Sequence, residues 1–305
     1  MMDISVVIGV NKRDLWLCRI CVASIRYYYP DVKIYLLKDE LNGKFSTKEV
    51  EKNWNVEQIK YPVKRFGWGA AKMHFFCDQR FAERKFLVLD SDIVITGRIL
   101  DEPFLKRFDQ DIIISEEYPV NPNSKWFTQT YFDYDVIRSH DPDFTFGGFT
   151  FNTGQIFCKG SFLDPKIVEP YFNFNGMPSW KRMDLFPLVD QSVLNYVLPQ
   201  QLKSGNIRIG RQSFMLWSET DRVKGLSLDE IKSGESLPFV IHWAGAFRTP
   251  LLGKMTRGDI LSFFEKKYYE KIFGGAVLRY TRRIKPFIIY QMRKVYHQIK
   301  QNLTN

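Results

Sequence analysis

The 305-residue sequence lacks several features that would each point to a particular class of protein. It has no run of about 18 apolar residues, so we expect no helix that spans a membrane. Its first ten residues, MMDISVVIGV, contain no basic stretch before the apolar ones, which predicts a first strand and no cleavable signal. It also contains no internal repeat and no low-complexity linker.

Cysteine is scarce, with only Cys18, Cys21, Cys77 and Cys158 present. The first two have CxxC spacing, but they lie in an apolar run without Gly or Pro, where residues i and i+3 share one helix face. We therefore expect both in a helix core, with a redox or metal role as the alternative. No second CxxC and no histidine pair completes a zinc site, and the cysteine usage favours a reducing, cytoplasmic compartment.

Acidic residues are missing after Glu270. The segment beyond it carries eight Lys or Arg residues out of a net charge of +10, which leaves only +2 on the first 270 residues. This distribution describes a nearly neutral globular body with a basic extension. It argues against a basic nucleic-acid-binding body, so we expect no nucleic acid partner.

The basic tail, residues 275–300, predicts two helical pieces that are broken at Pro286. In the second piece the apolar residues recur at i, i+4, i+7 and i+11 and share one face, while the basic residues lie elsewhere on the wheel: Ile288, Met292, Val295 and Ile299. A basic amphipathic helix is typical of a membrane-surface element, so residues 275–305 predict an anionic membrane surface as a partner and attachment to the inner face of the membrane. The alternative is that the tail packs back on the globular body with a basic outer face.

The rest of the chain alternates apolar strands with helical segments, which predicts an α/β fold with a mostly parallel sheet flanked by helices. We expect strands at residues 4–10, 33–37, 58–61, 86–89, 111–115 and 239–242, and helices at residues 14–28, 68–81 and 190–197. A further strand at 149–158 is expected to be interrupted at 152–154. The aromatic-rich segments 116–149 and 172–187 are expected to be irregular, and loops of this length usually carry a function.

The most informative segment is FLVLDSDIVIT, residues 86–96, in which an apolar strand runs into Asp90 and Asp92. Ionised carboxylates are costly to bury unless they are paired or bound to a metal. Ligands of parallel sheets bind at the carboxyl ends of the strands, and a turn at Ser91 would let both carboxylates converge on one hard cation. The sequence therefore predicts Mg²⁺ or Mn²⁺ held against a substrate phosphate, with a plain acidic turn as the alternative.

Two other polar positions fit such a site. His242 ends an apolar strand, where a neutral imidazole could complete an Asp/Asp/His set that suits Mn²⁺ better than Mg²⁺, although an ordinary hydrogen-bonded histidine is the alternative. Asp190 and Gln191 open a predicted helix, where the residues alone favour Asp190 as a helix cap.

Four motifs follow one another in the chain: LDSD (residues 89–92), FNTG (151–154), DQSVLN (190–195) and HWAG (242–245), with AKM (71–73) upstream. In this order they resemble the GT-A glycosyltransferases, and they are most similar to family 8, the retaining galactosyl- and glucosyltransferases that include bacterial lipooligosaccharide enzymes and glycogenin. The resemblance covers roughly residues 4–250. It implies a catalytic domain at 1–256, with a nucleotide-sugar half to about residue 115 and an acceptor half from 116, followed by a basic helical extension at 257–305.

The resemblance also implies roles for individual residues. Asp90, Asp92 and His242 would hold the metal, and Asp190 and Gln191 would lie at the reacting sugar. The residues implied in donor binding are Val10, Asn11, Lys72, Ser91, Asn152, Gly154, Gly245 and Arg248. The chain departs from the family pattern at the last of these, because Arg248 stands where lysine is common and Thr249-Pro250 follows in place of Pro-Trp.

The sequence thus predicts a metal-dependent glycosyltransferase that moves a hexose from a UDP-sugar to a glycan or glycolipid hydroxyl with retention. An inverting enzyme would need a carboxylate base, for which Glu116, Glu117, Asp133 and Asp135 are candidates. A nucleotidyltransferase is disfavoured because the stretch VIGVNKRDLW after the first strand has a single glycine. A non-catalytic glycan- or membrane-binding protein with a donor-like fold is the remaining alternative.

Overall fold

The computed structural model describes residues 4–67, 69–105, 108–117, 121–234, 239–245 and 248–304, without the side chains of residues 285, 289, 290 and 293–304. Its contacts divide the chain into two compact units. Unit 1 comprises Met1–Leu15, Asp31–Ser91 and Ile99–Met215, and unit 2 comprises Trp16–Pro30, Asp92–Arg98 and Leu216–Asn305. The functional division at residues 115 and 256 that the sequence implies stays a prediction.

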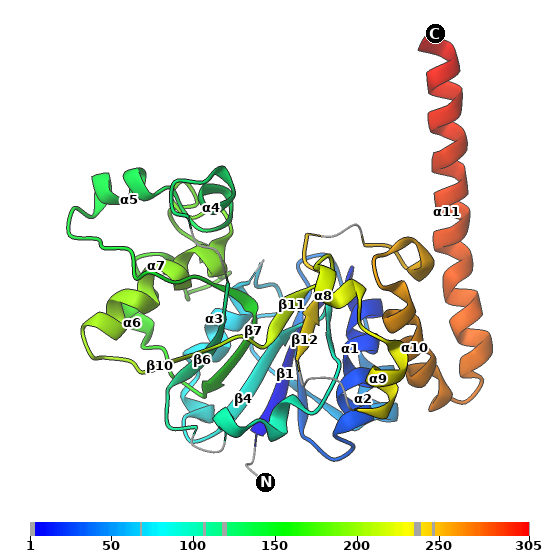
Figure 1. Cartoon of the computed structure of the whole chain (residues 1–305), viewed down its shortest axis with the longest axis horizontal. Helices are drawn as coiled ribbons and strands as arrows, with labels where there is room; N and C mark the ends of the chain where they lie inside the picture. Colours follow the sequence, from blue (N-terminus) through cyan, green and yellow to red (C-terminus); the bar gives the residue numbers. More distant parts are fainter. Residues whose placement is uncertain are drawn as a thin grey trace. The chain divides into compact units, whose positions relative to one another are not determined.

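Unit 1 is built on a seven-stranded sheet with the strand order β10-β6-β7-β4-β1-β2-β3 (Figure 1). The strands are β1 (Ile4–Asn11), β2 (Ile34–Asp39), β3 (Val56–Ile59), β4 (Lys85–Asp90), β6 (Ile112–Glu116), β7 (Phe151–Lys159) and β10 (Ile209–Gln212). Neighbouring strands pair in parallel except for β7, which is antiparallel to both β4 and β6. The predicted mostly parallel sheet is therefore confirmed.

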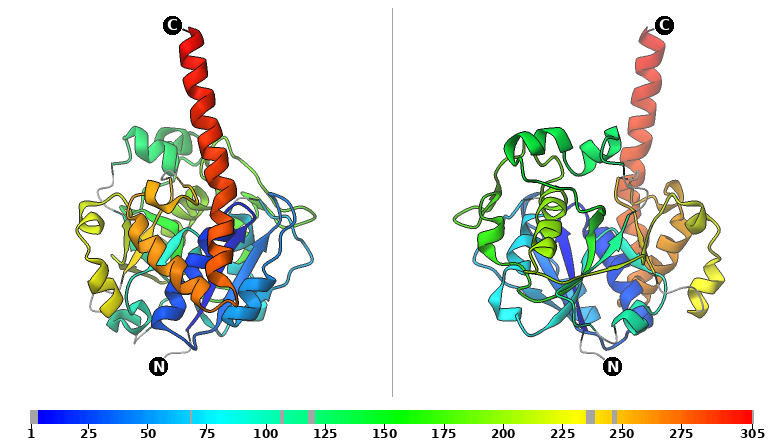
Figure 2. Two further views of the ribbon diagram at one scale, coloured as in Figure 1. Left: turned by 90° about the vertical axis from the view of Figure 1, so that its right-hand side faces the viewer. Right: turned by 60° about the vertical axis from the view of Figure 1, so that its left-hand side comes forward.

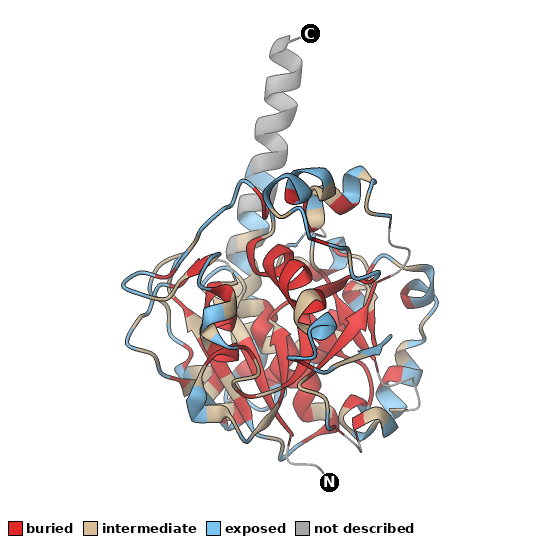
Figure 3. Cartoon of the chain, turned by 90° about the vertical axis from the view of Figure 1, so that its left-hand side faces the viewer, coloured by how far each residue is buried: buried red, intermediate tan, exposed pale blue. Residues whose placement is uncertain are grey.

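Helices and short turns connect the strands of unit 1. They are α2 (Lys48–Trp54), α3 (Ala70–Phe76), η1 (Gln79–Phe81), η2 (Ile99–Asp101), η3 (Pro103–Leu105), α4 (Lys125–Thr130), α5 (Tyr134–His140), α6 (Pro165–Val168) and α7 (Val189–Lys203). A small hairpin of β8 (Phe172–Asn173) and β9 (Ser179–Trp180) precedes α7. The strands of the sheet are mostly buried (Figure 3), and their apolar side chains pack with α3 and α7 into one core.

Unit 2 contains a three-stranded sheet of order β11-β12-β5, with β5 (Ile93–Ile95), β11 (Met215–Trp217) and β12 (Val240–His242). Its helices are α1 (Leu15–Tyr28), α8 (Asp221–Lys224), α9 (Leu228–Ser233), η4 (Leu252–Lys254), α10 (Gly258–Glu270) and α11 (Gly275–Thr304). The first turns of α11 lie beside α10 in both views of Figure 2. Arg279 and Arg283 both form ion pairs with Glu265 there.

Most expected elements occur within one or two residues of their predicted positions. The third strand lies two residues earlier than expected, at Val56–Ile59. Cys18 and Cys21 are buried in α1, as predicted for a helix core. A turn at Ser91 and Asp92 separates β4 from β5, also as predicted.

Two predictions around the site were wrong. Strand β7 is not interrupted at residues 152–154, because the side chains of Asn152 and Thr153 have hydrogen-bond partners on α7 and stay in the strand while buried. Segment 116–149 is not irregular throughout, since it holds α4 and α5. Ser124 and Asp133 cap these two helices by accepting hydrogen bonds from backbone N–H groups of the first turn.

Three predictions of helix and loop extent were also wrong. Helix α3 ends at Phe76 and a separate 3-10 turn follows after Asp78, while Trp68 lies outside the described residues. Segment 172–187 contains the β8–β9 hairpin. The tail forms one helix through Pro286, because a proline within a helix removes a single backbone hydrogen bond and need not end it.

Candidate functional site

The turn after β4 places the carboxylate of Asp92 beside the imidazole of His242, and both residues belong to unit 2. Strand β12 pairs antiparallel with β5 in a register that places His242 opposite Ile93, and the Trp243 N–H donates to the carbonyl of Asp92 at 3.0 Å. This register brings His242 Nε2 to 3.1 Å from Asp92 Oδ1. Both side chains are buried, so each needs a polar partner, and the strand pairing supplies one.

Arg248 supplies a second partner for the same carboxylate. Its Nη1 lies 2.7 Å from Asp92 Oδ2, and about a third of the Arg248 side chain remains exposed. Burial alone would raise the pKa of Asp92, but His242 and Arg248 together lower it to about 2. Asp92 is therefore an ionised carboxylate at neutral pH.

Asp92 and His242 of unit 2 can hold a metal ion together, and Asp90 is the last residue of β4 in unit 1, two residues before Asp92 in the chain. A carboxylate oxygen and an imidazole nitrogen give a mixed O/N donor set of the kind that Mn²⁺ accepts. A cation binds to a deprotonated carboxylate, and Asp92 is in that state.

The imidazole of His242 is fixed by an aromatic ring. It stacks on Trp217 with the ring centroids 5.2 Å apart and the planes 15° apart. Within the part of the chain that the structure describes, its Nδ1 is buried without a hydrogen-bond partner. Ligating histidines usually donate their second nitrogen to a carboxylate or a carbonyl. Stacking on Trp217 takes over that orienting role here.

Lys72 joins two of the motif carboxylates in unit 1. Its Nζ lies 3.0 Å from Asp90 Oδ1 and 3.0 Å from Asp190 Oδ2, and it donates to the carbonyl of Thr153 at 3.1 Å. Burial by itself would lower the pKa of Lys72, but the two carboxylates raise it well above its usual value. Lys72 is therefore a buried ammonium ion and does not lie on a solvated helix face.

Asp190 and Gln191 lie in the first turn of α7 and point toward β7. Asp190 Oδ2 accepts from Thr153 Oγ1 at 3.0 Å, and Gln191 Oε1 accepts from Asn152 Nδ2 at 2.6 Å. Helix α7 starts without a side-chain cap, so the alternative that Asp190 serves as a cap is wrong. Both side chains are buried against the start of β7. This strand pairs with β4, which carries Asp90.

Three residues that hold this arrangement were missed as site residues at the level of sequence. Asn195 clamps α7 to β7, because its side chain accepts from the Phe151 N–H at 3.0 Å and donates to the Phe151 carbonyl at 2.8 Å. Thr153 contacts both Asp190 and Lys72. The signal for Asn195 and Thr153 was their place within the motifs DQSVLN and FNTG. The spacing of DQSVLN fixes which face of α7 meets the strand.

Gly69 is the third missed residue. It precedes α3 with a φ of +70°, and a Cβ at this position would lie 2.2 Å from Asp190 Oδ1. Only glycine allows the carboxylate to come this close to the start of α3. The signal was a glycine directly before the predicted AKM helix.

The other predicted donor-binding residues occupy strand ends and turns. Asn11 ends β1, and its side-chain oxygen accepts from the N–H groups of Arg13 and Asp14, so it forms a turn. Gly154 donates its N–H to Asn152 Oδ1 at 2.8 Å. Val10 and Ser91 are buried, and Gly245 is exposed with a φ of +69°. Their contacts with a donor stay predictions.

Comparison with known proteins was informative only at the level of structure. No protein-family model matches the sequence, and no curated protein matches it. The apo structure of the bifunctional glycosyltransferase WbbM aligns with a TM-score of 0.54 and 15% identity, over 92% of this chain and 51% of that chain. The apo form of the glycosyltransferase GlyE from Streptococcus pneumoniae TIGR4 aligns with a TM-score of 0.48 and 16% identity, over 93% and 64% of the two chains.

The galactosyltransferase LgtC, in complex with donor and acceptor sugar analogs, gives a TM-score of 0.48 and 15% identity over 87% of this chain and 95% of that chain. The present chain spans about half the length of WbbM and less than two thirds of GlyE. At this level of identity the likeness to WbbM establishes the fold. The chain has a GT-A-type glycosyltransferase fold, as the motifs predicted.

Proposed function

We propose that this protein is a metal-dependent glycosyltransferase that moves a hexose from a UDP-sugar to a hydroxyl of a glycan or glycolipid, with retention of configuration. The observation that supports this most strongly is the buried Lys72 ammonium, which lies 3.0 Å from a carboxylate of the LDSD motif and 3.0 Å from one of the DQSVLN motif. Charged groups are costly to bury, and here one ammonium and two carboxylates meet at the carboxyl end of β4, which is typical of a functional site. The assignment to family 8 rests on the motifs.

The metal site would consist of Asp90, Asp92 and His242, with Mn²⁺ or Mg²⁺ as the ion. A divalent cation bound there neutralises negative charge that develops on the departing diphosphate. Arg248 would contact the same diphosphate through its guanidinium group, which can hold two phosphate oxygens at once. Val10 and Asn11 would contact the uracil and ribose, and Ser91, Asn152, Gly154 and Gly245 would line the donor sugar and phosphates.

Asp190 and Gln191 would lie at the transferred sugar. Asp190 is held by Lys72 and Thr153, so its carboxylate is oriented before a substrate arrives and can support the positive charge on the anomeric carbon. Gln191 is a weak nucleophile, and its amide oxygen already accepts from Asn152. We therefore favour attack on the same face. The acceptor oxygen bonds to the anomeric carbon as the bond to the diphosphate breaks, and the acceptor proton passes to the leaving phosphate.

An inverting reaction is less well supported, because most candidate bases have structural partners. Glu116 is paired with Arg211 at 2.8 Å, and Glu117 accepts a hydrogen bond from Tyr131. Asp133 caps α5, which leaves Asp135 as the exposed candidate among the four. Determination of the product anomer by NMR distinguishes the two outcomes.

We also propose that α11 lies on an anionic membrane surface. The three arginines of its first turns contact α10, through Glu265 and Tyr269, while a set of apolar side chains is exposed: Val277, Tyr280, Ile284, Phe287, Ile288 and Met292. These six share one side of the helix at 100° per residue. The alternative, in which the tail packs on the globular body with a basic outer face, therefore does not describe these turns, because their arginines face α10. In the part of the chain that the structure describes, we find no helix with the length and hydropathy needed to span a bilayer.

The central experiment replaces Asp92 with alanine. A bound cation contributes several kcal/mol, and each ~1.4 kcal/mol is tenfold in rate, so Asp92→Ala should lower Mn²⁺-dependent transfer or UDP-sugar hydrolysis by about a thousandfold. Asp229→Ala, an exposed aspartate of α9, is the matched control and should keep full activity. The donor is found first by thermal shift with UDP-glucose, UDP-galactose and UDP-N-acetylglucosamine in the presence of Mn²⁺. Retained turnover in folded Asp92→Ala would remove the central assignment.

A further inference from the structure

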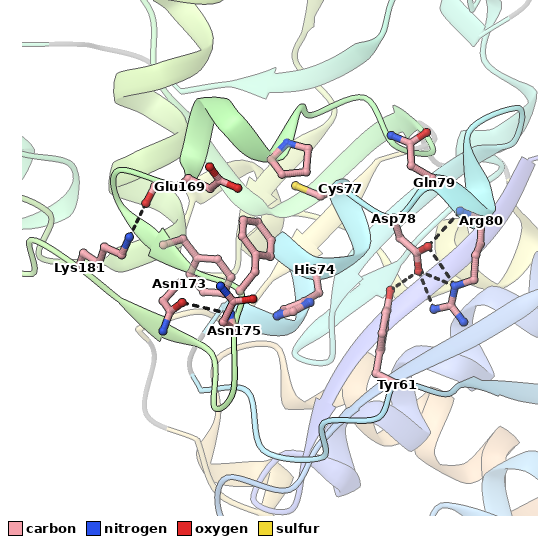
Figure 4. A pocket seen from close by; sticks show the side chains of 13 residues that line it. Tyr61, His74, Cys77, Asp78, Gln79, Arg80, Glu169, Asn173, Asn175 and Lys181 are labelled. Atoms are coloured by element: carbon pink, nitrogen blue, oxygen red, sulfur yellow. Dashed lines mark hydrogen bonds and ion pairs between the residues drawn. The ribbon is translucent and has the colours of Figure 1, made fainter.

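Unit 1 contains a cavity on the side of α3 that faces away from Lys72. Successive helical residues are about 100° apart, so Lys72 and His74 point in nearly opposite directions. Lys72 reaches Asp90 and Asp190, whereas His74 lines a cavity of about 730 Å³ (Figure 4). This volume lies within the range of small-molecule sites.

The floor of the cavity is aromatic. The His74 ring lies 5.7 Å from the Phe172 ring and 5.2 Å from the Phe174 ring, both edge to face, and 6.0 Å from the Tyr61 ring. Phe172 is fully buried and packs on Trp180 across the β8–β9 hairpin, so it supports the half-buried rings of His74 and Phe174 from behind. Burial lowers the pKa of His74, which keeps the imidazole neutral.

The rim of the cavity is polar but carries no net charge. Asp78 and Arg80 form an ion pair at 2.6 Å, and the Tyr61 hydroxyl donates to Asp78 at 2.9 Å. On the opposite side lie Glu169 and Lys181 (Figure 4), and the Lys181 ammonium donates to the backbone carbonyl of Glu169 at 2.7 Å. One carboxylate and one ammonium leave no net charge on this side. Three side-chain amides complete the rim: Gln79, Asn173 and Asn175. Amides present donors and acceptors side by side, which is what sugar hydroxyls require.

We propose that this cavity binds a neutral saccharide, as a second glycan site on the face of α3 opposite to the reaction site. Aromatic rings that cover the apolar face of a sugar, together with amides that pair with its hydroxyls, match this ligand class. A nucleotide or another phosphate would need an excess of positive charge, which the rim lacks. A lipid chain would cover the polar groups of the rim without pairing them.

The choice of a glycan as ligand rests on the proposed transferase function, because a glycan acceptor or product longer than one sugar needs a second contact. Segment 172–187, which the sequence predicted to contribute to the acceptor site, supplies Phe172, Phe174 and the two asparagines of the rim. The cavity would retain a part of the glycan that takes no part in the reaction. Binding itself requires neither the metal nor the donor.

The test uses the full chain without metal or nucleotide. Lactose, maltotriose and chitotriose are titrated in saturation-transfer NMR against the wild type, the rim variant Gln79→Ala/Asn175→Ala and the control Asn206→Ala/Gln212→Ala. All four substituted residues are exposed, so folding should be unaffected. At least one saccharide should bind the wild type at millimolar concentration. The rim variant should weaken this binding about tenfold, as expected from the loss of two hydrogen bonds, and the control should leave it unchanged.

The proposal fails if none of the three saccharides binds, or if the rim variant binds as well as the wild type. A parallel titration with UDP and Mn²⁺ should give equal binding for the wild type and the rim variant. If the wild type does not bind UDP, the transferase proposal is contradicted instead. The two failures are therefore distinguishable.

Discussion

Trp217 lies parallel to the imidazole of His242, with the ring centroids 5.2 Å apart. The stacked ring orients a histidine whose Nδ1 has no hydrogen-bond partner among the described residues. A flat hydrophobic contact therefore fixes the direction in which Nε2 points.

We predict that Trp217→Ala raises the Mn²⁺ concentration needed for half-maximal activity by about ten- to a hundredfold, the usual effect of losing a group that orients a metal ligand. Trp217→Phe keeps a ring against His242 and should restore most of the affinity. Mn²⁺ titration of both variants, followed by electron paramagnetic resonance and by activity, measures this. If Trp217→Ala binds Mn²⁺ like the wild type, Trp217 does not position the ligand.

Gly69→Ala should damage the reaction site through Asp190. The new Cβ would lie 2.2 Å from Asp190 Oδ1, so the carboxylate must move away from Lys72. We expect kcat to fall by at least about a hundredfold, because small displacements of a positioned group have effects of this size.

Gly67→Ala is a closely matched control for that variant. Gly67 also has a positive φ, +103°, but no atom lies within 4 Å of the position its Cβ would take. It should therefore share the backbone cost of about 1 kcal/mol without the loss in kcat. Steady-state kinetics and urea unfolding separate the effect on kcat from the effect on stability. Equal kcat values for both variants would show that the close approach of Asp190 to Gly69 does not affect the reaction rate.

Lys72→Met should destabilise the fold by about 3–5 kcal/mol, because it leaves Asp90 and Asp190 near each other without their shared cation. The double variant Lys72→Met/Asp190→Asn removes one of those charges and should recover part of the stability but none of the activity. Urea unfolding at neutral pH gives both free energies. A double variant no more stable than the single one would contradict this account of the ion pairs.

Ile288→Glu/Met292→Glu should abolish binding of the protein to vesicles that contain phosphatidylserine, because both side chains belong to the exposed apolar side of α11. The variant Ile288→Ser/Met292→Ser removes apolar area without adding charge and should weaken binding less. UDP-sugar hydrolysis should not change in either variant. Vesicle sedimentation measures the binding, and full retention by the glutamate variant, or by a chain without residues 275–305, would rule out the membrane role.

The sequence was most informative where chemistry and periodicity coincide. The apolar run of β4 followed by two carboxylates predicted both the strand and the turn at Ser91, and the four ordered motifs predicted the fold type. It was least informative where tertiary contacts override local signals. Asn152 and Thr153 look like a break in a strand, yet β7 continues because α7 satisfies their polar groups.

Other features could not be predicted from the sequence, because they depend on contacts between residues far apart in the chain. The burial of Lys72 between Asp90 and Asp190 follows from the packing of α3 beside β4 and α7. The aromatic cavity combines residues 61–80 with residues 165–181, and no local pattern relates these two segments.

Strand β7 is antiparallel to both of its neighbours, and it is synthesised after them. Until residues 151–159 leave the ribosome, β4 and β6 each present an unpaired edge of apolar strand, and such edges are templates for association with other chains. A nascent or truncated chain that stops between residues 117 and 150 lacks both β7 and β10, so β4 has one open edge and β6 has two. A premature stop codon in this interval should therefore yield an insoluble product.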